Sequence, residues 1–314
     1  MDNIGTFKMA VCILNYKNYG KAYKCLKSCL NQNGQHDIFL FDNVSNDGSY
    51  EQLKKEFDSK IIFVKNDINL GFAKGNNEII KQMKNQGYSH TLLLNNDTEF
   101  VNIQTLNKLK KAVFDNWDAG IIAPIIINKR LKGDERVKNT SILIKMLLLF
   151  GIIPRCKKNN TKRYKKVYTA HGSALVVNND IFLKVGGFPE ENFMYGEETT
   201  FCRKVTLLRV PIVQCLSNDC IMFHNHELEY SSELWRKYLM GRNTYLEIKL
   251  YSGYKRVAFR IIMSIYKIRY KLKRTEENKI FLQGLEDAKK ILNDHLSDEE
   301  IRQRTIDFVK KYNS

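Results

Sequence analysis

The sequence has no paired cysteine motif and no long apolar run. Its seven cysteines include no CxxC pair and leave one over, so neither a disulfide framework nor a cysteine-based zinc site is expected. No segment reaches the roughly 18 apolar residues that a membrane-spanning helix needs. Residues 1–6 carry no secretion signal, so we expect reduced thiols in a cytoplasmic protein.

Low-complexity tracts and internal repeats are also missing. The hydrophobic share of 43% and the charged share of 27% are ordinary for a globular protein, which excludes a disordered or collagen-like chain. Residues 15–20 contain only Gly20, so the glycine-rich phosphate loop of a dinucleotide dehydrogenase is absent. The same absence argues against a nucleotidyltransferase, although this function stays open as an alternative.

Acidic residues are scarce relative to basic ones. Asp and Glu number 34 against 51 Lys and Arg, a formal net charge of +17. This excess suggests a polyanionic partner: nucleic acid, an anionic membrane surface or a phosphorylated substrate. The run 162–166 is basic and aromatic, as in some nucleic-acid-binding proteins, but no recognised motif accompanies it. Nucleic-acid binding is therefore kept as an alternative and not as the expected partnership.

Short apolar runs alternate with helical patterns in the first part of the chain. The expected strands are 10–14, 38–41, 61–64, 91–94 and 120–127, and the expected helices are 21–30, 50–57, 76–84 and 103–114. This alternation predicts an α/β fold with a mostly parallel sheet. Ligands of such sheets bind beyond the carboxyl ends of the strands, where Asn15, Asp42 and Asp97 lie.

The rest of the chain divides by composition. Residues 129–166 hold thirteen Lys and Arg against two acidic residues and predict a long, partly mobile insertion. Regular structure is expected again up to about residue 226, and helices from 231 to the end. We therefore expect a nucleotide-binding half (1–128), an acceptor-binding and catalytic half (129–230) and a basic helical region (231–314).

Three clusters could carry chemistry. Asp97 follows an apolar strand and is a candidate ligand for Mg²⁺ or Mn²⁺, although Asn and Asp also favour plain turns. Glu197 and Glu198 open a predicted helix, where they could serve as a general base and its partner or merely cap the helix. His224 and His226 could place one imidazole on a metal, but two histidines alone do not make a zinc site.

The order of these clusters resembles glycosyltransferase family 2, and within it the rhamnosyltransferase-like bacterial branch. The resemblance covers about residues 9–245. It rests on VCILNY at 11–16, FDNVSNDGS at 41–49, NLGFAKGNN at 69–77, NND at 95–97, and HGSAL at 171–175 with GGF at 186–188. It implies a GT-A fold and inverting transfer of a sugar from dTDP-rhamnose or a UDP-sugar. The acceptor would be a glycan or a lipid-linked glycan in bacterial surface polysaccharide synthesis.

The resemblance also implies roles for individual residues. Asp97 would hold the metal, with His224 near a histidine that helps to bind metal or diphosphate, and Glu198 would be the base beside Glu197. Asp42 would contact the base or ribose. The remaining donor-binding positions that the matched segments imply are Asn15, Asp47, Asn69, Gly71, Lys74, Asn76 and Asn96.

Three positions depart from the family pattern. The metal motif begins with Asn95 where an acidic residue is usual, so Asp97 alone supplies a full charge. Thr200 stands where relatives carry a further carboxylate, and Pro189 stands where they carry Asp. These departures affect the acceptor geometry and the division of labour between Glu197 and Glu198 more than the reaction class.

The region 236–274 is strongly basic. It carries twelve Lys and Arg and a single acid, Glu247, interleaved with apolar and aromatic residues. This composition is typical of helices that lie on anionic lipid, although a solvated basic face on a packed helical pair has it as well. We expect a peripheral location on the inner face of the cell membrane.

Overall fold

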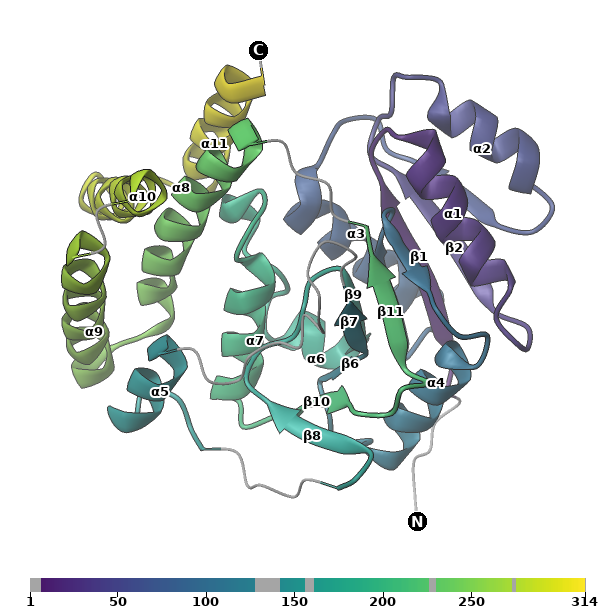
Figure 1. Ribbon diagram of the computed structural model, residues 1–314, viewed down its shortest axis with the longest axis horizontal. Coiled ribbons are helices and arrows are strands. Elements are labelled where there is room, and N and C mark those ends of the chain that lie inside the picture. The colour runs from purple at the N-terminus through teal and green to yellow at the C-terminus, as the bar shows by residue number, and fades with distance from the viewer. Residues whose placement is uncertain (1–6, 128–141, 156–160, 226–229, 273–274, 314) are drawn as a thin grey trace.

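The computed structural model describes residues 7–127, 142–155, 161–225, 230–272 and 275–313. A central sheet has helices on both faces, and further helices follow at the C-terminal side (Figure 1). The strands are β1 (Met9–Asn15), β2 (Asp37–Asp42), β3 (Ile62–Lys65), β4 (His90–Asn95), β5 (Thr98–Phe100), β6 (Ile121–Ala123), β7 (Ile125–Ile127), β8 (Tyr164–Val167), β9 (Ala174–Asn178), β10 (Ile212–Cys215) and β11 (Ile221–His224).

The helices confirm the expected alternation with the strands. They are α1 (Tyr19–Leu30), α2 (Ser49–Phe57), α3 (Gly71–Asn85), α4 (Thr105–Asp115), α5 (Ile142–Leu149), α6 (Asn179–Lys184), α7 (Glu197–Leu207), α8 (Tyr230–Leu246), α9 (Gly253–Leu272), α10 (Glu276–Asn293) and α11 (Asp298–Asn313). Two short 3₁₀ turns, η1 (Glu190–Asn192) and η2 (Glu247–Leu250), complete the described elements.

The first four strands of the main sheet are parallel, as the sequence predicts, and the later strands make the sheet mixed. Its order is β3-β2-β1-β4-β9-β6-β10-β8, and β3, β2, β1 and β4 run parallel. β9 is antiparallel to both β4 and β6. The expected strand 120–127 divides at Pro124 into β6 of the main sheet and β7 of a second sheet, β5-β11-β7. Proline cannot donate to a ladder, which favours a break there.

Alternate residues of β1 face two different cores. Val11 and Ile13 pack in a cluster with residues of α1, α2 and α4. Ala10 and Cys12 pack in another cluster with residues of α3, α6 and α7. Successive side chains of a strand point to opposite faces, so a central strand covered on both faces is apolar throughout. The result is a three-layer α/β arrangement whose strand ends are free to form a site.

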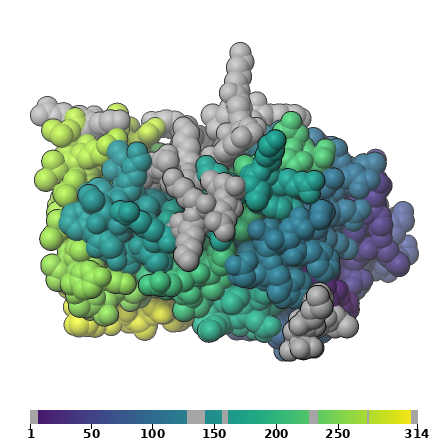
Figure 2. All heavy atoms as spheres, turned by 90° about the horizontal axis from the view of Figure 1, so that it is seen from below, coloured from purple at the N-terminus to yellow at the C-terminus, as the bar shows by residue number. Residues whose placement is uncertain are grey.

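The C-terminal helices form a third core. Buried residues of α5, α8, α9 and α10, with Ile301 of α11, make up one cluster. The described part of the expected insertion thus contains a helix, α5, packed beside α9 (Figure 2). No helix of the described segments is both long and apolar enough to cross a membrane. The six cysteines in the described ranges are buried and free.

Helices α8 and α10 approach closely at two glycines. A Cβ atom added to Gly284 would lie 2.1 Å from the Tyr238 carbonyl oxygen, and one added to Gly241 would lie 2.1 Å from the Phe281 carbonyl oxygen. Neither backbone oxygen can move without moving its helix. Glycine at these positions therefore sets the distance between the two helices.

We predict that Gly284→Ala destabilises the protein by separating α8 from α10. Overpacking of this kind costs about 1–3 kcal/mol, measurable as a lower midpoint of unfolding in urea. Gly20→Ala is the matched control, because nothing lies within 4 Å of its added Cβ and alanine favours the α1 helix. Equal stability of the two variants would show that the helix contact is not tight.

Candidate functional site

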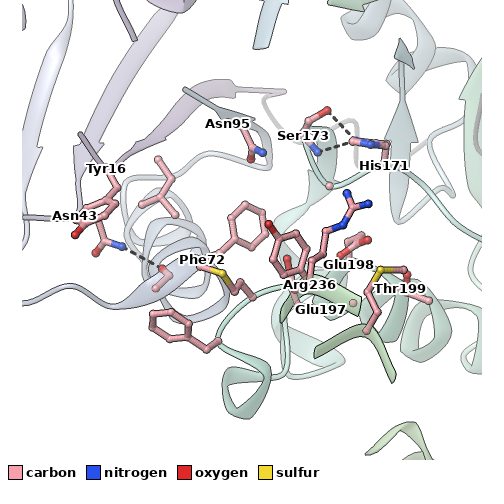
Figure 3. Close-up of a pocket in the computed structure, with 18 of the residues that line it drawn as sticks. Tyr16, Asn43, Phe72, Asn95, His171, Ser173, Glu197, Glu198, Thr199 and Arg236 are labelled. Carbon is pink, nitrogen blue, oxygen red and sulfur yellow. Dashed lines mark hydrogen bonds between the residues drawn. The ribbon is translucent and has the colours of Figure 1, made fainter. Parts of the chain in front are cut away.

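A cleft of about 1240 Å³ lies at the carboxyl ends of the parallel strands. Leu14, Asn43 and Asn95 line it from the ends of β1, β2 and β4. Residues 193–199, which end in the first turn of α7, and several residues of α8 form the opposite wall. Figure 3 shows Glu197, Glu198 and Thr199 on this side, with Arg236 of α8. The cleft therefore joins the sheet to the C-terminal helices.

A buried polar network holds the floor of this cleft. The Asn15 amide donates to Asp42 Oδ1 at 2.9 Å, and its own oxygen accepts from Asn96 Nδ2 at 2.8 Å. Ser45 donates to both Asp42 oxygens, from its hydroxyl at 2.6 Å and its backbone N–H at 2.8 Å. Asn15 and Asp42 are fully buried. The network therefore fastens the ends of three adjacent strands to one another.

Two asparagines shape the side of the cleft next to α3. Asn69 Oδ1 accepts hydrogen bonds from Asn43 Nδ2 at 2.9 Å and from the Gly71 N–H at 2.8 Å. Gly71 has a φ of +72°, and a Cβ there would lie 2.5 Å from the Phe193 ring. Glycine is thus required at this turn for conformation and for space.

The pairing of β5 with β11 brings Asp97 and His224 together. His224 lies opposite Thr98 in this antiparallel ladder, so it stands beside the residue that precedes Thr98. His224 Nε2 is 3.3 Å from Asp97 Oδ1, and the two side chains are only 7% and 13% exposed. The His171 ring lies edge-on to the His224 ring, with centroids 5.2 Å apart.

This arrangement offers two ligands for a metal ion, the Asp97 carboxylate and the His224 imidazole. Among the residues described, no group of three or more His, Cys, Asp or Glu is arranged to hold an ion. Mg²⁺ and Mn²⁺ in phosphate-transfer sites are usually held by one or two protein ligands, substrate phosphates and water. The pair of Asp97 and His224 fits such a shared site for a divalent ion.

Glu197 and Glu198 both line the cleft from the first turn of α7. Burial raises the pKa of Glu197 well above its ordinary value, and the neighbouring charge of Glu198 raises it further. Burial also raises the pKa of Glu198, although N–H groups at the helix start and His171 partly offset this. Proton uptake by this pair is therefore favoured at a higher pH than for exposed carboxylates.

A third carboxylate reaches the same cleft from the end of α8. Glu247 is 2% exposed, and its Oε2 lies 3.5 Å from Nε of the equally buried Arg203 of α7. Burial raises the pKa of Glu247, against the effect of Arg203 and of a hydrogen bond with Thr200. A carboxylate from a distant part of the chain thus lies next to Thr200.

Comparison with known proteins shows the family of this chain. The model of the family described as Glycosyl transferase family 2 matches residues 10–186, more than half of the chain. The chain belongs to glycosyl transferase family 2. The family expected from the sequence motifs is thereby confirmed, and the protein is an enzyme that transfers sugars; the rhamnosyltransferase-like branch stays a prediction.

Three similar proteins show how far this likeness extends. The low-salt glycan biosynthesis hexosyltransferase Agl10 of Haloferax volcanii is 27% identical over 242 residues, which cover 76% of this chain and 74% of that protein. The mannosyltransferase PcManGT from Pyrobaculum calidifontis, solved with GDP-Man and Mn²⁺, has a TM-score of 0.58 at 12% identity, covering 98% of this chain and 83% of that one. S. aureus TarS 1–349 with UDP-GlcNAc has a TM-score of 0.58 at 16% identity, covering 90% and 80%. The two solved structures confirm the GT-A type of fold.

In the structure of this glycosyltransferase, most of the residues predicted for the site line the cleft. Those that line it are Asn69, Gly71, Asn96, Asp97, Glu197, Glu198 and His224. Asn15 and Asp42 lie beneath it in the buried network, and Asn43 rather than Asp42 faces the cavity. His226 lies outside the described residues.

Three other predicted residues are placed away from the cavity wall. Asp47 is exposed and accepts from the Asn18 N–H at 3.0 Å and from the Ser49 N–H at 3.2 Å. Asn76 is buried in α3 and donates to the Phe72 carbonyl oxygen at 2.9 Å. Lys74 is half-buried on the same helix. Their roles in donor binding stay predictions.

Sequence reasoning missed the contribution of α8. Trp235 and Arg236 line the cleft, and in Figure 3 the Arg236 guanidinium lies between His171 and Glu198. Tyr195 packs edge-on against Trp235, with ring centroids 5.3 Å apart. No local spacing marks these residues as a site, because α8 reaches the cleft only through packing. The basic composition that includes Arg236 predicts a membrane surface or a solvated helical face, and neither places this residue in the cleft.

Proposed function

We propose that this glycosyltransferase moves a sugar from a nucleotide-diphosphate donor to a hydroxyl of a glycan or lipid-linked acceptor, with inversion at the transferred carbon. One observation carries the proposal: a single cleft contains both a metal-ligand pair, Asp97 and His224, and a carboxylate pair, Glu197 and Glu198. The first pair suits a diphosphate leaving group, and the second suits proton removal from the acceptor hydroxyl. The family match favours this chemistry over the nucleotidyltransferase alternative.

The donor end of the cleft is the end formed by the strands. Asn43, Asn69 and Asn96 present amides there, and Asp97 and His224 would hold Mn²⁺ or Mg²⁺. When bound, the ion would neutralise charge that develops on the departing nucleoside diphosphate. The proteins named above support a hexose donor, since they are a hexosyltransferase and two structures with GDP-Man or UDP-GlcNAc. We therefore rank UDP- and GDP-hexoses before dTDP-rhamnose.

The acceptor end is formed by α7 and α8. Glu198 would take the proton of the attacking hydroxyl, and Glu197, which is more deeply buried, would raise the affinity of the pair for that proton. The edge-on pair of Tyr195 and Trp235 supplies an aromatic wall for a sugar ring. A direct in-line attack needs one base and no covalent sugar–enzyme bond.

An anionic membrane is the proposed partner of α9. One face of this helix exposes an apolar stripe at helical spacing, which consists of Tyr254, Val257, Ile261, Ile265, Ile268 and Leu272. Four exposed basic residues accompany it, Arg256, Arg260, Arg269 and Lys271, and α9 contains no acid. Leu149, the last residue of the neighbouring α5, is also exposed.

The basic residues of α9 favour lipid, rather than a second copy of this chain, as the partner that covers the apolar stripe. Two α9 helices packed face to face would bring like charges together. An anionic leaflet would instead attract each basic residue by about 1 kcal/mol and accept the apolar side chains. A lipid-linked acceptor would also be available at such a surface.

The metal proposal predicts that Asp97→Ala loses metal-dependent donor binding. Asn95 and Asn96 offer only neutral oxygens, so this change removes the one carboxylate of the turn. Calorimetry with UDP- and GDP-sugars in Mn²⁺ should show wild-type binding that EDTA abolishes and that the variant lacks. Asn95→Ala is the control and should bind more weakly without losing the metal response. Full turnover by Asp97→Ala at saturating Mn²⁺ would overturn the assignment.

The base proposal predicts that Glu198→Gln keeps donor affinity and loses transfer by at least ~10²-fold in kcat, the scale of a general base. Glu197→Gln should show a smaller fall in kcat. Because the pKa of Glu198 is raised, the wild-type rate should rise with pH through a value above ~4.3, the ordinary value for Glu. If Glu197→Gln is the inactive variant, the roles are reversed. If both variants stay active, the base lies elsewhere.

The membrane proposal predicts that wild-type protein floats with vesicles of phosphatidylglycerol and phosphatidylcholine but not with phosphatidylcholine alone. The double change Ile261→Glu and Ile265→Glu should abolish flotation, since it places two acids on the stripe. Ile68→Glu with Val101→Glu is the control, because both residues are equally exposed but lie elsewhere. Equal recovery with both vesicle types would contradict the proposal, and so would a dimer that only the α9 variant dissociates.

A further inference from the structure

The segment just before the two catalytic carboxylates is conformationally strained. Phe193 has φ 59° and ψ −54°, and the Met194 N–H donates to the Asn192 carbonyl at 2.6 Å, which makes a tight three-residue turn. Tyr195 also has a positive φ, 63°, and Gly196 follows at 87°. Each such non-glycine residue is strained and persists only when its surroundings hold it.

Asn243 of α8 holds this turn through its side-chain amide. Its Nδ2 donates to the carbonyl oxygens of Met194 at 3.2 Å and Tyr195 at 2.5 Å. Its Cβ also lies 3.4 Å from where a Cβ on Gly196 would be. One side chain thus supplies a hydrogen bond to two successive carbonyl oxygens of the left-handed turn. Asn243 is itself 1% exposed, so water does not compete for these bonds.

Arg242 fixes the orientation of that amide. Its Nε and one terminal nitrogen donate to Asn243 Oδ1 at 2.9 and 2.8 Å, which turns Nδ2 towards the loop. The same terminal nitrogen reaches the Asn192 carbonyl at 3.4 Å, and the other donates to the Thr305 hydroxyl of α11. The guanidinium therefore connects α8, α11 and the turn.

Stability alone does not account for this arginine. Arg242 is 2% exposed, and none of the ion pairs within the described segments includes it. Burial lowers the pKa of Arg242 to about 10, which reflects the cost of keeping the charge in place. A buried charge held by neutral amides and hydroxyls costs free energy of folding. The hydrogen bonds that Arg242 directs, rather than a gain in stability, therefore account for its presence.

The turn is also anchored on the donor side of the cleft. The Phe193 carbonyl accepts from the Phe72 and Ala73 N–H groups at 3.1 and 3.3 Å, at the start of α3. The Phe193 ring packs over Gly71, which lines the cleft. A displacement of the turn would therefore move the carboxylates relative to the donor-side wall.

We propose that Arg242 and Asn243 are positioning residues for sugar transfer, which hold the turn 192–196 so that Glu197 and Glu198 face the bound donor at the correct distance. Neither residue needs to touch a substrate for this. The proposal rests on the proposed function, because it assigns these carboxylates to proton removal. It explains why the helices after residue 230 belong to the catalytic site.

The test compares Asn243→Ala and Asn243→Asp with Asn179→Ala. Asn179 is equally buried and donates to the Tyr88 carbonyl at 2.8 Å, but it lies outside the cleft. Misplaced catalytic groups cost on the order of 10²-fold in rate, so we expect kcat of both Asn243 variants to fall by at least about tenfold. Donor affinity by calorimetry should stay near the wild-type value. Asn179→Ala should lose stability and keep its kcat.

A second readout does not depend on activity. Hydrogen exchange of the backbone amides 194–198, followed by mass spectrometry, should accelerate in the Asn243 variants and not in Asn179→Ala. Thr305→Val, which removes one partner of Arg242, should accelerate it less. Unchanged exchange at 194–198 in Asn243→Ala would overturn the proposal. An equal fall in kcat in the Asn179→Ala control would overturn it as well, because the loss would then follow from lower stability alone.

The two proposals can fail separately. If wild-type protein transfers no sugar from any nucleotide donor but the Asn243 variants release the turn, the assigned reaction is wrong and the hydrogen-bonded support of the turn stands. If wild-type protein transfers sugar and Asn243→Asp does so at the same rate, the reaction stands and the positioning role is excluded.

Discussion

The Asn15 side chain fixes the floor of the active-site cleft. It is buried at the end of β1, and it binds Asp42 at the end of β2 and Asn96 just after β4. Parallel strands bring their carboxyl ends to one edge of a sheet, but the loops that follow are otherwise free to diverge. The buried hydrogen bonds remove that freedom, so Asn43, Asn96 and Asp97 face the same space. Unpaired, these groups would cost free energy of desolvation.

The opposite wall of the cleft depends on helices that come much later in the chain. The carboxylates of α7 follow a strained turn that α8 and α3 hold from two sides. The close contact of α8 and α10 at Gly241 and Gly284 holds α8 itself. Residues of α8 therefore line the same cleft as the strand ends.

The site concentrates buried acids at a cost in stability. Glu197 and Glu247 are 5% and 2% exposed, and burial raises the pKa of both. A carboxyl whose pKa is raised in the folded state is destabilising above its unfolded-state pKa, and the destabilisation grows as pH increases through the shifted value. The same burial makes the pair of Glu197 and Glu198 more basic. Near neutral pH the burial of these carboxyls therefore lowers the stability of the folded state.

The sequence by itself determined the family, the α/β alternation and several of the residues that line the cleft. Motifs such as 69–77 and 95–97 are local, because a turn after a strand needs particular residues whatever the rest of the chain does. Tertiary structure alone decided that Asp42 lies under the cleft while Asn43 faces it, since one residue of displacement reverses the direction of a side chain. It also decided that Trp235, Arg236 and Glu247 join the site. Their positions follow from the packing of α8 against α10 and against the turn before α7, contacts between residues far apart in sequence that no local pattern encodes.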